Sequence, residues 1–470
     1  MPLNSAELLV RLDDDRRLPL RVRLTMALRD MLRTGQVSPG STLPSSRVLA
    51  RDLGISRGVV VEAYAQLTAE GYLLSRAGAG TTAPPSHTQS RQVPTPTPPQ
   101  PEPAGGLDLR PGTPDLSSFP RRAWLAAVRE TLSTLPTSQL GYGEPWGAQV
   151  LRTQLSDYLA RVRGAMADPD SVVVVTGATQ GVSLVAQILL RRGQRTVAVE
   201  DPSNALQRRL LRDLGLEVVD VPVDDHGLRV DALAATGART VLCTPAHQYP
   251  TGVILSAERR MQLSRWAQEV DGLVVEDDYD AEFRYGRPAV GCLQGLDVAH
   301  VALLGSVSKS LAPALRLGWV LAPASLLEDL RQAKSHADFG SNILDQHVLS
   351  AFMASGGYDR NLRLLRRRYA ERREHLIAAL AARAPAWQPI GAAGGLHLVV
   401  RLPPDLSEDG LVRAAAATGV QVLGLAGMTG RCPQGPALVL SFARSTPDML
   451  AEAVRRLVLA AEGLDSPSGD

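Results

Sequence analysis

The sequence predicts two structural domains: a small, mainly helical one, and a large α/β domain that ends in a smaller α+β lobe. Three observations support this prediction. Residues 84–103 hold eight prolines and almost no apolar periodicity, which is typical of an extended linker. Apolar residues before this segment follow a helical spacing, whereas strand and helix patterns alternate after it. From about Leu362 an Arg-rich helix, further strands and a last helix replace that alternation.

These patterns set the expected boundaries of the domains. The helical domain is expected at residues 1–83 and the linker at 84–107. The large domain is expected at 108–470, with its small lobe at about 362–470. Each part is treated below in chain order.

Composition restricts the class of protein. The net charge of +2 is nearly neutral, so a surface for nucleic acid has to come from local arrangement. The cysteines Cys243, Cys292 and Cys432 lie far apart, which gives no metal-spaced pair and fits a reducing compartment. No signal peptide and no membrane-length apolar run is visible, so a cytoplasmic protein without a metal site is expected.

The N-terminal domain has the element order helix, turn, helix and β-wing. Ser45 or Ser46 is expected to cap the second helix and Ser56 the third, because a serine hydroxyl accepts from free N–H groups of a first turn. This order describes a winged helix-turn-helix, in which the reading helix enters the major groove of DNA. The helices are expected at residues 18–34, 45–53 and 57–70, and the wing strands at 72–75 and 81–83.

Four residues are candidates for DNA contact. Ser56 and Arg57 begin the reading helix, Arg47 begins the helix before it, and Arg76 adjoins the wing turn. Arginine suits both phosphate contacts and bidentate contacts to guanine. A helical protein-interaction module has the same periodicity and is the alternative.

The large domain reads as a doubly wound α/β fold. Several strand runs are continuous in Val and Leu, as expected when helices cover both faces of a sheet. About seven strands are expected, at residues 171–176, 196–199, 217–221, 239–244, 273–276, 300–304 and 317–321.

Polar residues follow two of these strands directly. The turn at Thr176–Gly181 precedes a helix, whose first N–H groups can bind an anion. Such a turn is also ordinary punctuation between a strand and a helix. Asp277, Asp278 and Tyr279 end another strand, and one buried acid there can hold a protonated pyridine nitrogen. A helix cap or a surface acid is the alternative reading.

A third strand leads to a lysine. The chain has only two lysines, Lys309 and Lys334, although Lys and Arg together number 50. Lys309 follows Ser306 and Ser308 and precedes Arg316, so it can be a Schiff-base amine beside a phosphate cradle, or a surface lysine. Because ligands bind at the carboxyl ends of strands in open α/β sheets, these three features can meet. Together they supply what pyridoxal 5′-phosphate (PLP) needs.

Longer motifs resemble a known family. The segment PSSRVLARDLGISRGVVVEAYAQLTAEGYL, from Pro44, resembles the winged helix of GntR-type bacterial regulators. SVSKSLAPALRLGW, from Ser306, resembles the cofactor-lysine motif of fold-type I aminotransferases. TPAHQYPTG, from Thr244, and EDDYDAEFRY, from Glu276, resemble the MocR branch of the GntR regulators. The resemblance spans essentially the whole chain.

The resemblance implies a PLP-dependent homodimer that binds operator DNA and regulates a nearby metabolic operon. By motif, Lys309 would bond to PLP covalently. Asp277 would pair with the pyridine nitrogen, with Asp278 as the alternative, and Tyr279 would bond the ring hydroxyl. Arg444 would take the carboxylate of an effector. The residues implied for the phosphate are Ala178, Thr179, Ser306 and Arg316.

Two positions depart from the family pattern. Asn204 stands where the family usually has a tyrosine that lies on the PLP ring, so aromatic stacking on the ring has to come from another residue. Tyr249 stands where the common aminotransferase motif has an asparagine, although an aromatic residue there fits the regulatory branch.

The sequence therefore favours a regulator that senses an amino compound, or PLP itself, through an aminotransferase-like domain. The rival hypothesis is a working aminotransferase with an accessory N-terminal domain, because a lysine beside PLP can also act as a general base. A third hypothesis is a PLP-free regulator in which Lys309 is structural.

Overall fold

The computed structural model describes residues 10, 18–76, 80–85, 106–286, 290–432 and 434–465. The chain divides into two compact units, Met1–Pro101 and Glu102–Asp470. Most of the predicted linker, 84–107, lies outside the described residues, so its extended form stays a prediction. Within the described ranges, no helix combines the length and apolarity needed to cross a membrane.

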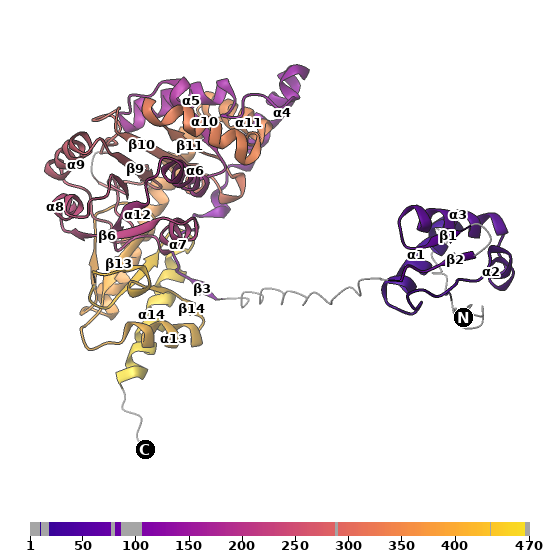
Figure 1. The fold of residues 1–470 in the computed structure, drawn as a ribbon. Coiled ribbons are helices and arrows are strands. Elements are labelled where there is room, and N and C mark those ends of the chain that lie inside the picture. Colours follow the sequence, from indigo (N-terminus) through magenta and orange to yellow (C-terminus); the bar gives the residue numbers. More distant parts are fainter. Residues whose placement is uncertain are drawn as a thin grey trace. The chain divides into compact units, whose positions relative to one another are not determined.

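The N-terminal unit is the predicted winged helix-turn-helix (Figure 1). Its hairpin is antiparallel, with Leu74 opposite Thr82. Three helices precede the hairpin in the described part of this unit. The elements are α1 (Leu20–Arg33), α2 (Ser46–Asp52), α3 (Arg57–Ala69), β1 (Leu74–Arg76) and β2 (Gly80–Thr82).

Serine caps fix the starts of α2 and α3. The Ser45 hydroxyl accepts from the backbone N–H of Val48, and the Ser56 hydroxyl accepts from that of Val59, both at 3.4 Å. Ser45 is therefore the cap of α2, and Ser46 is its first residue. Capping by serine typically stabilises a helix by about 1 kcal/mol, which matters for a helix as short as α2.

The helices of this unit enclose one apolar core. The predicted inner face of α3 is buried, and the Tyr64 hydroxyl donates to the Pro44 carbonyl at 2.9 Å. That hydrogen bond ties α3 to the segment that enters α2. The buried residues of α3 are Val60, Ala63, Tyr64 and Leu67.

The large unit is built on an eight-stranded sheet with the order β4-β11-β10-β9-β8-β5-β6-β7. β11 runs antiparallel to both of its neighbours, so the sheet is mixed, and it has one strand more than the about seven that the sequence predicts for this doubly wound α/β fold. The strands are β4 (Val172–Val175), β5 (Thr196–Asp201), β6 (Glu217–Asp224), β7 (Gly227–Leu228), β8 (Thr240–Cys243), β9 (Leu273–Asp278), β10 (Val301–Ser306) and β11 (Gly318–Leu321).

Both faces of this sheet are covered. Side chains alternate between faces along a strand, and in β4 Val172 and Val174 join one apolar cluster while Val173 and Val175 join another. This explains why the strand reads as a continuous apolar run. The covering helices are α5 (Gln149–Arg163), α6 (Ala178–Arg191), α7 (Ala205–Asp213), α8 (Val230–Ala234), α9 (Ala257–Glu269), α10 (Ala324–Asp338) and α11 (Ile343–Ala354), and α4 (Arg121–Thr134) packs on α11.

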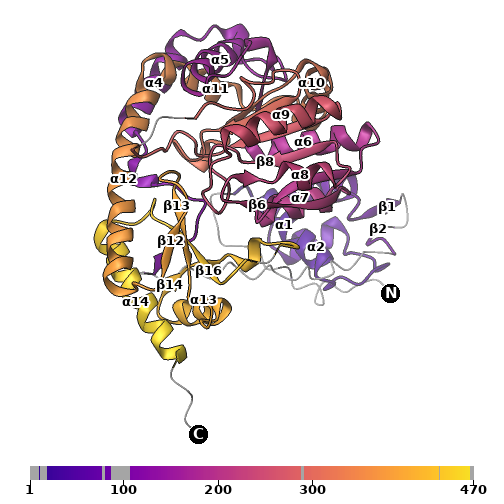
Figure 2. The ribbon, with the colours of Figure 1, turned by 90° about the vertical axis from the view of Figure 1, so that its left-hand side faces the viewer.

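A continuous helix joins the small lobe to the rest of the large unit. The long helix α12 (Gly357–Arg383) runs on into it and packs on the last helix, α14 (Pro447–Asp465) (Figure 2). β3 (Leu107–Asp108), at the start of the unit, pairs with β14 (Val420–Gln421) of this lobe. The other elements are β12 (Gln388–Ile390), β13 (His397–Arg401), α13 (Glu408–Ala417), β15 (Leu423–Gly424) and β16 (Ala437–Ser441).

Candidate cofactor site

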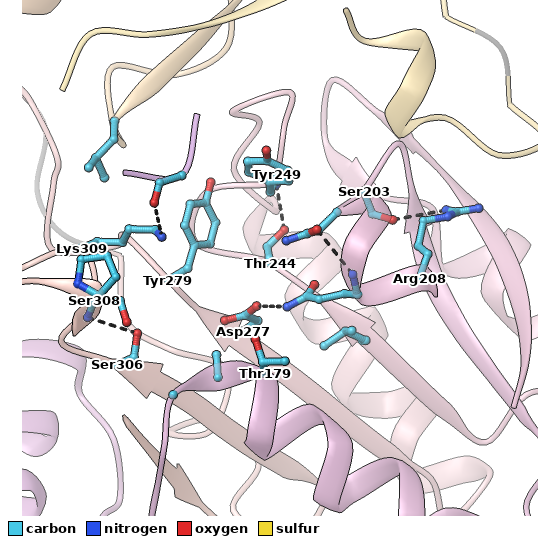
Figure 3. Close-up of a pocket in the computed structure, with 18 of the residues that line it drawn as sticks. Thr179, Ser203, Arg208, Thr244, Tyr249, Asp277, Tyr279, Ser306, Ser308 and Lys309 are labelled. Carbon is cyan, nitrogen blue, oxygen red and sulfur yellow. Dashed lines mark hydrogen bonds between the residues drawn. The ribbon is translucent and has the colours of Figure 1, made fainter. Parts of the chain in front are cut away.

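A cavity of about 360 Å³ lies at the carboxyl ends of β4, β9 and β10, where the sequence places its three polar features. This volume is within the range of small-molecule pockets. Figure 3 shows Thr179, Asp277, Tyr279 and Lys309 around the same space. The small lobe contributes Leu396 and His397 to the lining.

Lys309 presents its amine to this cavity. Its Nζ donates to the backbone carbonyl of Gly112 at 2.6 Å. Burial lowers the pKa of Lys309, and the negative charges of Asp277 and Asp280 oppose that effect. A lowered pKa increases the neutral fraction of the amine, which is the form that attacks an aldehyde.

The structure separates the two adjacent acids. Asp277 lines the cavity, and its Oδ2 accepts from Gln207 Nε2 at 2.6 Å. Its Oδ1 is buried and has no hydrogen-bond partner. Asp278 faces the opposite side of β9 and pairs with Arg163 at 2.6 Å. Burial raises the pKa of Asp277 to about 6, so a cation or N–H donor bound beside it would be strongly favoured.

Gly177, Arg316 and the first turn of α6 form a compact anion cradle. No side chain caps α6, whose first residues Ala178 and Thr179 line the cavity with Ser306. Gly177 has φ +104°, and a Cβ there would lie 3.1 Å from the Arg316 guanidinium. The cradle thus combines a helix N-terminus, hydroxyl groups and a cation, a combination that suits a phosphate.

Tyr279 and Tyr249 also line the cavity. Their rings meet edge to face, with centroids 5.7 Å apart. The Tyr279 hydroxyl lies 2.9 Å from Nδ1 of His247, a residue outside the lining. Burial raises the pKa of Tyr279 well above its usual range, so this hydroxyl keeps its proton at neutral pH.

Asn204 has a structural role as the N-cap of helix α7. Its Oδ1 accepts from the backbone N–H groups of Leu206 and Gln207, at 3.0 and 3.4 Å, and so caps α7. Helix α7 is the element that carries Gln207 to Asp277. Asn204, which stands where the family usually has a stacking tyrosine, therefore supports Asp277 through α7 and Gln207.

Asn204→Ala is expected to lower the free energy of unfolding by about 1 kcal/mol, because two N–H groups of α7 lose their acceptor. Chemical denaturation of the full chain measures this loss. Asn204→Asp keeps an acceptor at the cap and should stay close to the wild type. Equal destabilisation by both substitutions would contradict the capping role.

Arg444 is not among the residues that line this cavity. It lies beyond the end of β16 and donates to Asp108 Oδ2 at 2.6 Å. The cations of the lining are Lys309, Arg208 and Arg316, with His397 as a further titratable group. Arg208 is itself buried and paired with Asp220. The structure therefore does not bring Arg444 together with the other predicted residues.

The candidate DNA-contact residues lie on the N-terminal unit. Arg47, Ser56 and Arg57 are exposed, and Arg57 Nε donates to the Ser46 hydroxyl at 3.4 Å, which joins the starts of α2 and α3. Arg76 ends β1, but its side chain lies outside the described residues.

Comparison with known proteins agrees with both units. The family model "Bacterial regulatory proteins, gntR family" matches residues 20–82, and "Aminotransferase class I and II" matches residues 107–457. The pyridoxine biosynthesis transcriptional regulator PdxR of Corynebacterium glutamicum is 33% identical, over 95% of this chain and 96% of its own. The probable rhizopine catabolism regulatory protein MocR of Rhizobium meliloti is 30% identical, over 97% and 96%.

The chain belongs to the MocR-type regulators of the GntR family. Its large unit also resembles solved aminotransferases. The α-aminoadipate aminotransferase LysN of Thermus thermophilus, complexed with N-(5′-phosphopyridoxyl)-L-leucine, has a TM-score of 0.69 and 27% identity. That match covers 77% of this chain and 93% of LysN. The fold class predicted from the sequence is confirmed.

The cavity of this MocR-type regulator fits PLP on its own geometry. The unpartnered Oδ1 of Asp277 is an acceptor for a pyridine N–H, and the Gly177 cradle leaves room where a Cβ would meet Arg316. Lys309 lies in the same lining. In the described part of the chain, no cluster of His, Cys, Asp and Glu could hold a metal ion.

Three residues of this site had no role in the sequence analysis. Gln207 holds Asp277, His247 contacts Tyr279, and His397 faces the cavity from β13. His247 lies within the motif that begins at Thr244, so a signal for it existed. Gln207 and His397 reach the site only through the packing of α7 and the small lobe, which no local pattern reveals.

Proposed function

We propose that this protein is a ligand-responsive transcriptional regulator whose large unit holds PLP. An amino compound, or PLP itself, would change how the winged helix engages operator DNA. The observation that carries this proposal is the buried, unpartnered Oδ1 of Asp277 in the same cavity as the Lys309 amine. Few ligands other than PLP present a pyridine nitrogen and an aldehyde together.

The residues of the cavity take complementary roles in this proposal. The Lys309 amine would hold PLP through its aldehyde, Asp277 would accept from the pyridine N–H, and Tyr279 would bond the ring hydroxyl. Bound PLP supplies an electrophilic carbon that captures primary amines. Ala178, Thr179, Ser306 and Arg316 would hold the phosphate.

Coupling between the two units requires that the ligand bind two states of the protein with different affinity. The test measures affinity of the full chain for an operator fragment selected from a random-sequence DNA pool, with and without PLP and with a panel of amino compounds. A ligand-dependent change in affinity that Lys309→Ala abolishes supports the proposal. Identical affinity under all conditions would remove the sensing role.

The rival function is catalytic turnover by the aminotransferase-like unit. The aromatic-amino-acid aminotransferase 1 of Thermococcus litoralis is 26% identical over 67% of this chain, whereas the regulators cited above match almost all of it. The regulators match both units, including the winged helix, and this favours regulation over catalysis. Steady consumption of an amino donor with a keto-acid acceptor would favour the enzyme instead.

Arg57 is the strongest candidate for direct reading of DNA, because it is exposed at the first position of α3. Arg57→Ala should weaken operator binding by roughly 1–3 kcal/mol, and relax the base preference at one position. Arg209→Ala is the matched control, because its side chain is 79% exposed on α7 and the net charge changes equally. Equal loss of operator affinity in both variants would show that the effect comes from overall charge alone.

We also propose that the protein is a homodimer. It would act in the cytoplasm, where the chromosome lies. The large unit exposes apolar side chains that a second copy would cover, and two of them, Tyr142 and Phe339, meet edge to face. Exposed large apolar side chains of the segment 116–142 are Leu116, Leu125, Leu132, Leu140 and Tyr142, and Phe339 is exposed as well.

A further inference from the structure

A buried histidine and aspartate lie behind the hydroxyl of Tyr279. Nδ1 of His247 is 2.9 Å from the Tyr279 hydroxyl and 3.1 Å from Oδ2 of Asp280. The side chains of His247 and Asp280 are 2% and 1% exposed. One nitrogen therefore faces two oxygen atoms, and only one of these oxygens belongs to the cavity lining.

The position of one proton follows from this geometry. A carboxylate only accepts hydrogen bonds, so Nδ1 has to carry a hydrogen to make a favourable contact with Asp280. The opposite tautomer would set the Nδ1 lone pair against the carboxylate oxygen. With the hydrogen on Nδ1, the Tyr279 oxygen can only accept from His247. The hydroxyl hydrogen of Tyr279 then has to point elsewhere.

The cavity is where that hydrogen can go. Tyr279 lines the cavity, and its proton is retained because burial raises its pKa. The titratable groups around the pair are Asp277, Asp280, Glu200 and Tyr249 near Tyr279, His397 near His247, and Lys309 near Asp280.

We propose that His247 is a positioning residue that makes the Tyr279 hydroxyl a hydrogen-bond donor toward the ring oxygen of PLP. This inference rests on the proposed function in one respect, that PLP occupies the cavity. It adds the residue that sets the direction of the Tyr279 hydrogen bond. His247 acts only through Tyr279.

Backbone from two parts of the large unit holds the imidazole ring in place. A Cβ on Gly395 would lie 2.2 Å from His247 Cε1 and 2.5 Å from Asp280 Oδ2, and one on Gly252 would lie 3.1 Å from His247 Nε2. Both glycines have a positive φ. The backbone N–H of Ala392 also donates to the carbonyl of Gly252 at 2.9 Å, so the two segments are joined. The ring has little freedom to turn away from Tyr279.

A fixed donor has a spectroscopic consequence. Donation to the ring oxygen stabilises its ionised form, and this lowers the pH at which the visible absorption band of bound PLP changes. A hydrogen bond to a charged group is strong enough to move such a midpoint by roughly one to two pH units. Loss of the donor should therefore raise the midpoint by that amount.

The experiment titrates the visible band of the full chain loaded with PLP. His247→Phe keeps a ring of similar size but cannot donate to the Tyr279 oxygen, so its midpoint should rise, by less than the roughly one to two pH units expected when the Tyr279 hydroxyl itself is removed. His247→Asn keeps an N–H near the Nδ1 position and should titrate like the wild type. His300→Asn is the matched control, because it removes a histidine paired with Asp297 at 2.9 Å outside the cavity lining. His247→Ala replaces the Phe variant if that variant does not fold.

A double substitution separates positioning from general loosening of the structure. In the Tyr279→Phe background, His247→Phe should cause no further shift, because the hydroxyl it positions is gone. An equal shift in both backgrounds, or an unchanged midpoint in a His247→Phe protein that binds PLP, overturns the inference alone. A wild-type protein without any PLP band overturns the proposed function, and the inference with it.

Discussion

Lys309→Ala is expected to abolish the visible absorption band that PLP gives with the wild-type protein. The substitution removes the cavity amine that can bond covalently to the PLP aldehyde, while the cradle at Gly177 and the acid Asp277 remain. PLP should then bind reversibly and dialyse away. Absorption spectra of both proteins, recorded after dialysis with equal amounts of PLP, measure the difference.

The small number of lysines makes this experiment unusually decisive. Reduction with borohydride fixes PLP to the amine that carries it, and the chain offers Lys309, Lys334 and the N-terminus as amines. Lys334 is buried, and its Nζ donates to Asp338, Ser341 and Gln180. Peptide mass mapping should place the adduct on Lys309. An adduct on Lys334, or a band retained by Lys309→Ala, would refute the assignment.

The second large effect is expected for Asp277→Asn, which should act on PLP affinity and on stability in opposite directions. An amide cannot carry the charge that pairs with a protonated pyridine. Truncation of one partner of a buried charge pair costs enough to weaken PLP binding on the order of 100-fold. Fluorescence titration with PLP measures that loss, and Asp271→Asn is the control, because its side chain is 90% exposed and lies outside the cavity lining.

Without ligand, the same substitution should stabilise the protein at neutral pH. Burial raises the pKa of Asp277 from 3.8 to about 6, so the folded state binds the proton more tightly than the unfolded state. Stability from this group is therefore complete below pH 3.8 and is lost as the pH rises through about 6. The difference of about two units corresponds to as much as about 3 kcal/mol.

The pH profile of unfolding tests this sign. Denaturant titrations of the ligand-free wild type and of Asp277→Asn between pH 4 and pH 8 should diverge as the pH rises, with the variant more stable at the upper end. Glu200 and Glu276 are also buried with raised pKa values and titrate in both proteins, so the difference between the two curves is the quantity to compare. Parallel curves would show that burial does not raise the pKa of Asp277.

The sequence by itself determined the local elements and the residue types that end them. Strand runs such as the four valines of β4, and serine caps such as Ser56, are decided by neighbours within a few residues. The scarcity of lysine singled out Lys309 without any structure. The meeting of three strand ends followed from the general rule for open α/β sheets.

The tertiary structure alone decided which atoms meet. Asp277 and Asp278 are adjacent in sequence and point to opposite faces, and only the packing of α7 and Arg163 shows which face holds the cavity. The direction of β11 was likewise not encoded in its own pattern. Arg444 pairs with Asp108, a residue 336 positions away, because β16 and the segment at β3 adjoin in the small lobe. Such contacts depend on long-range packing, which local periodicity cannot specify.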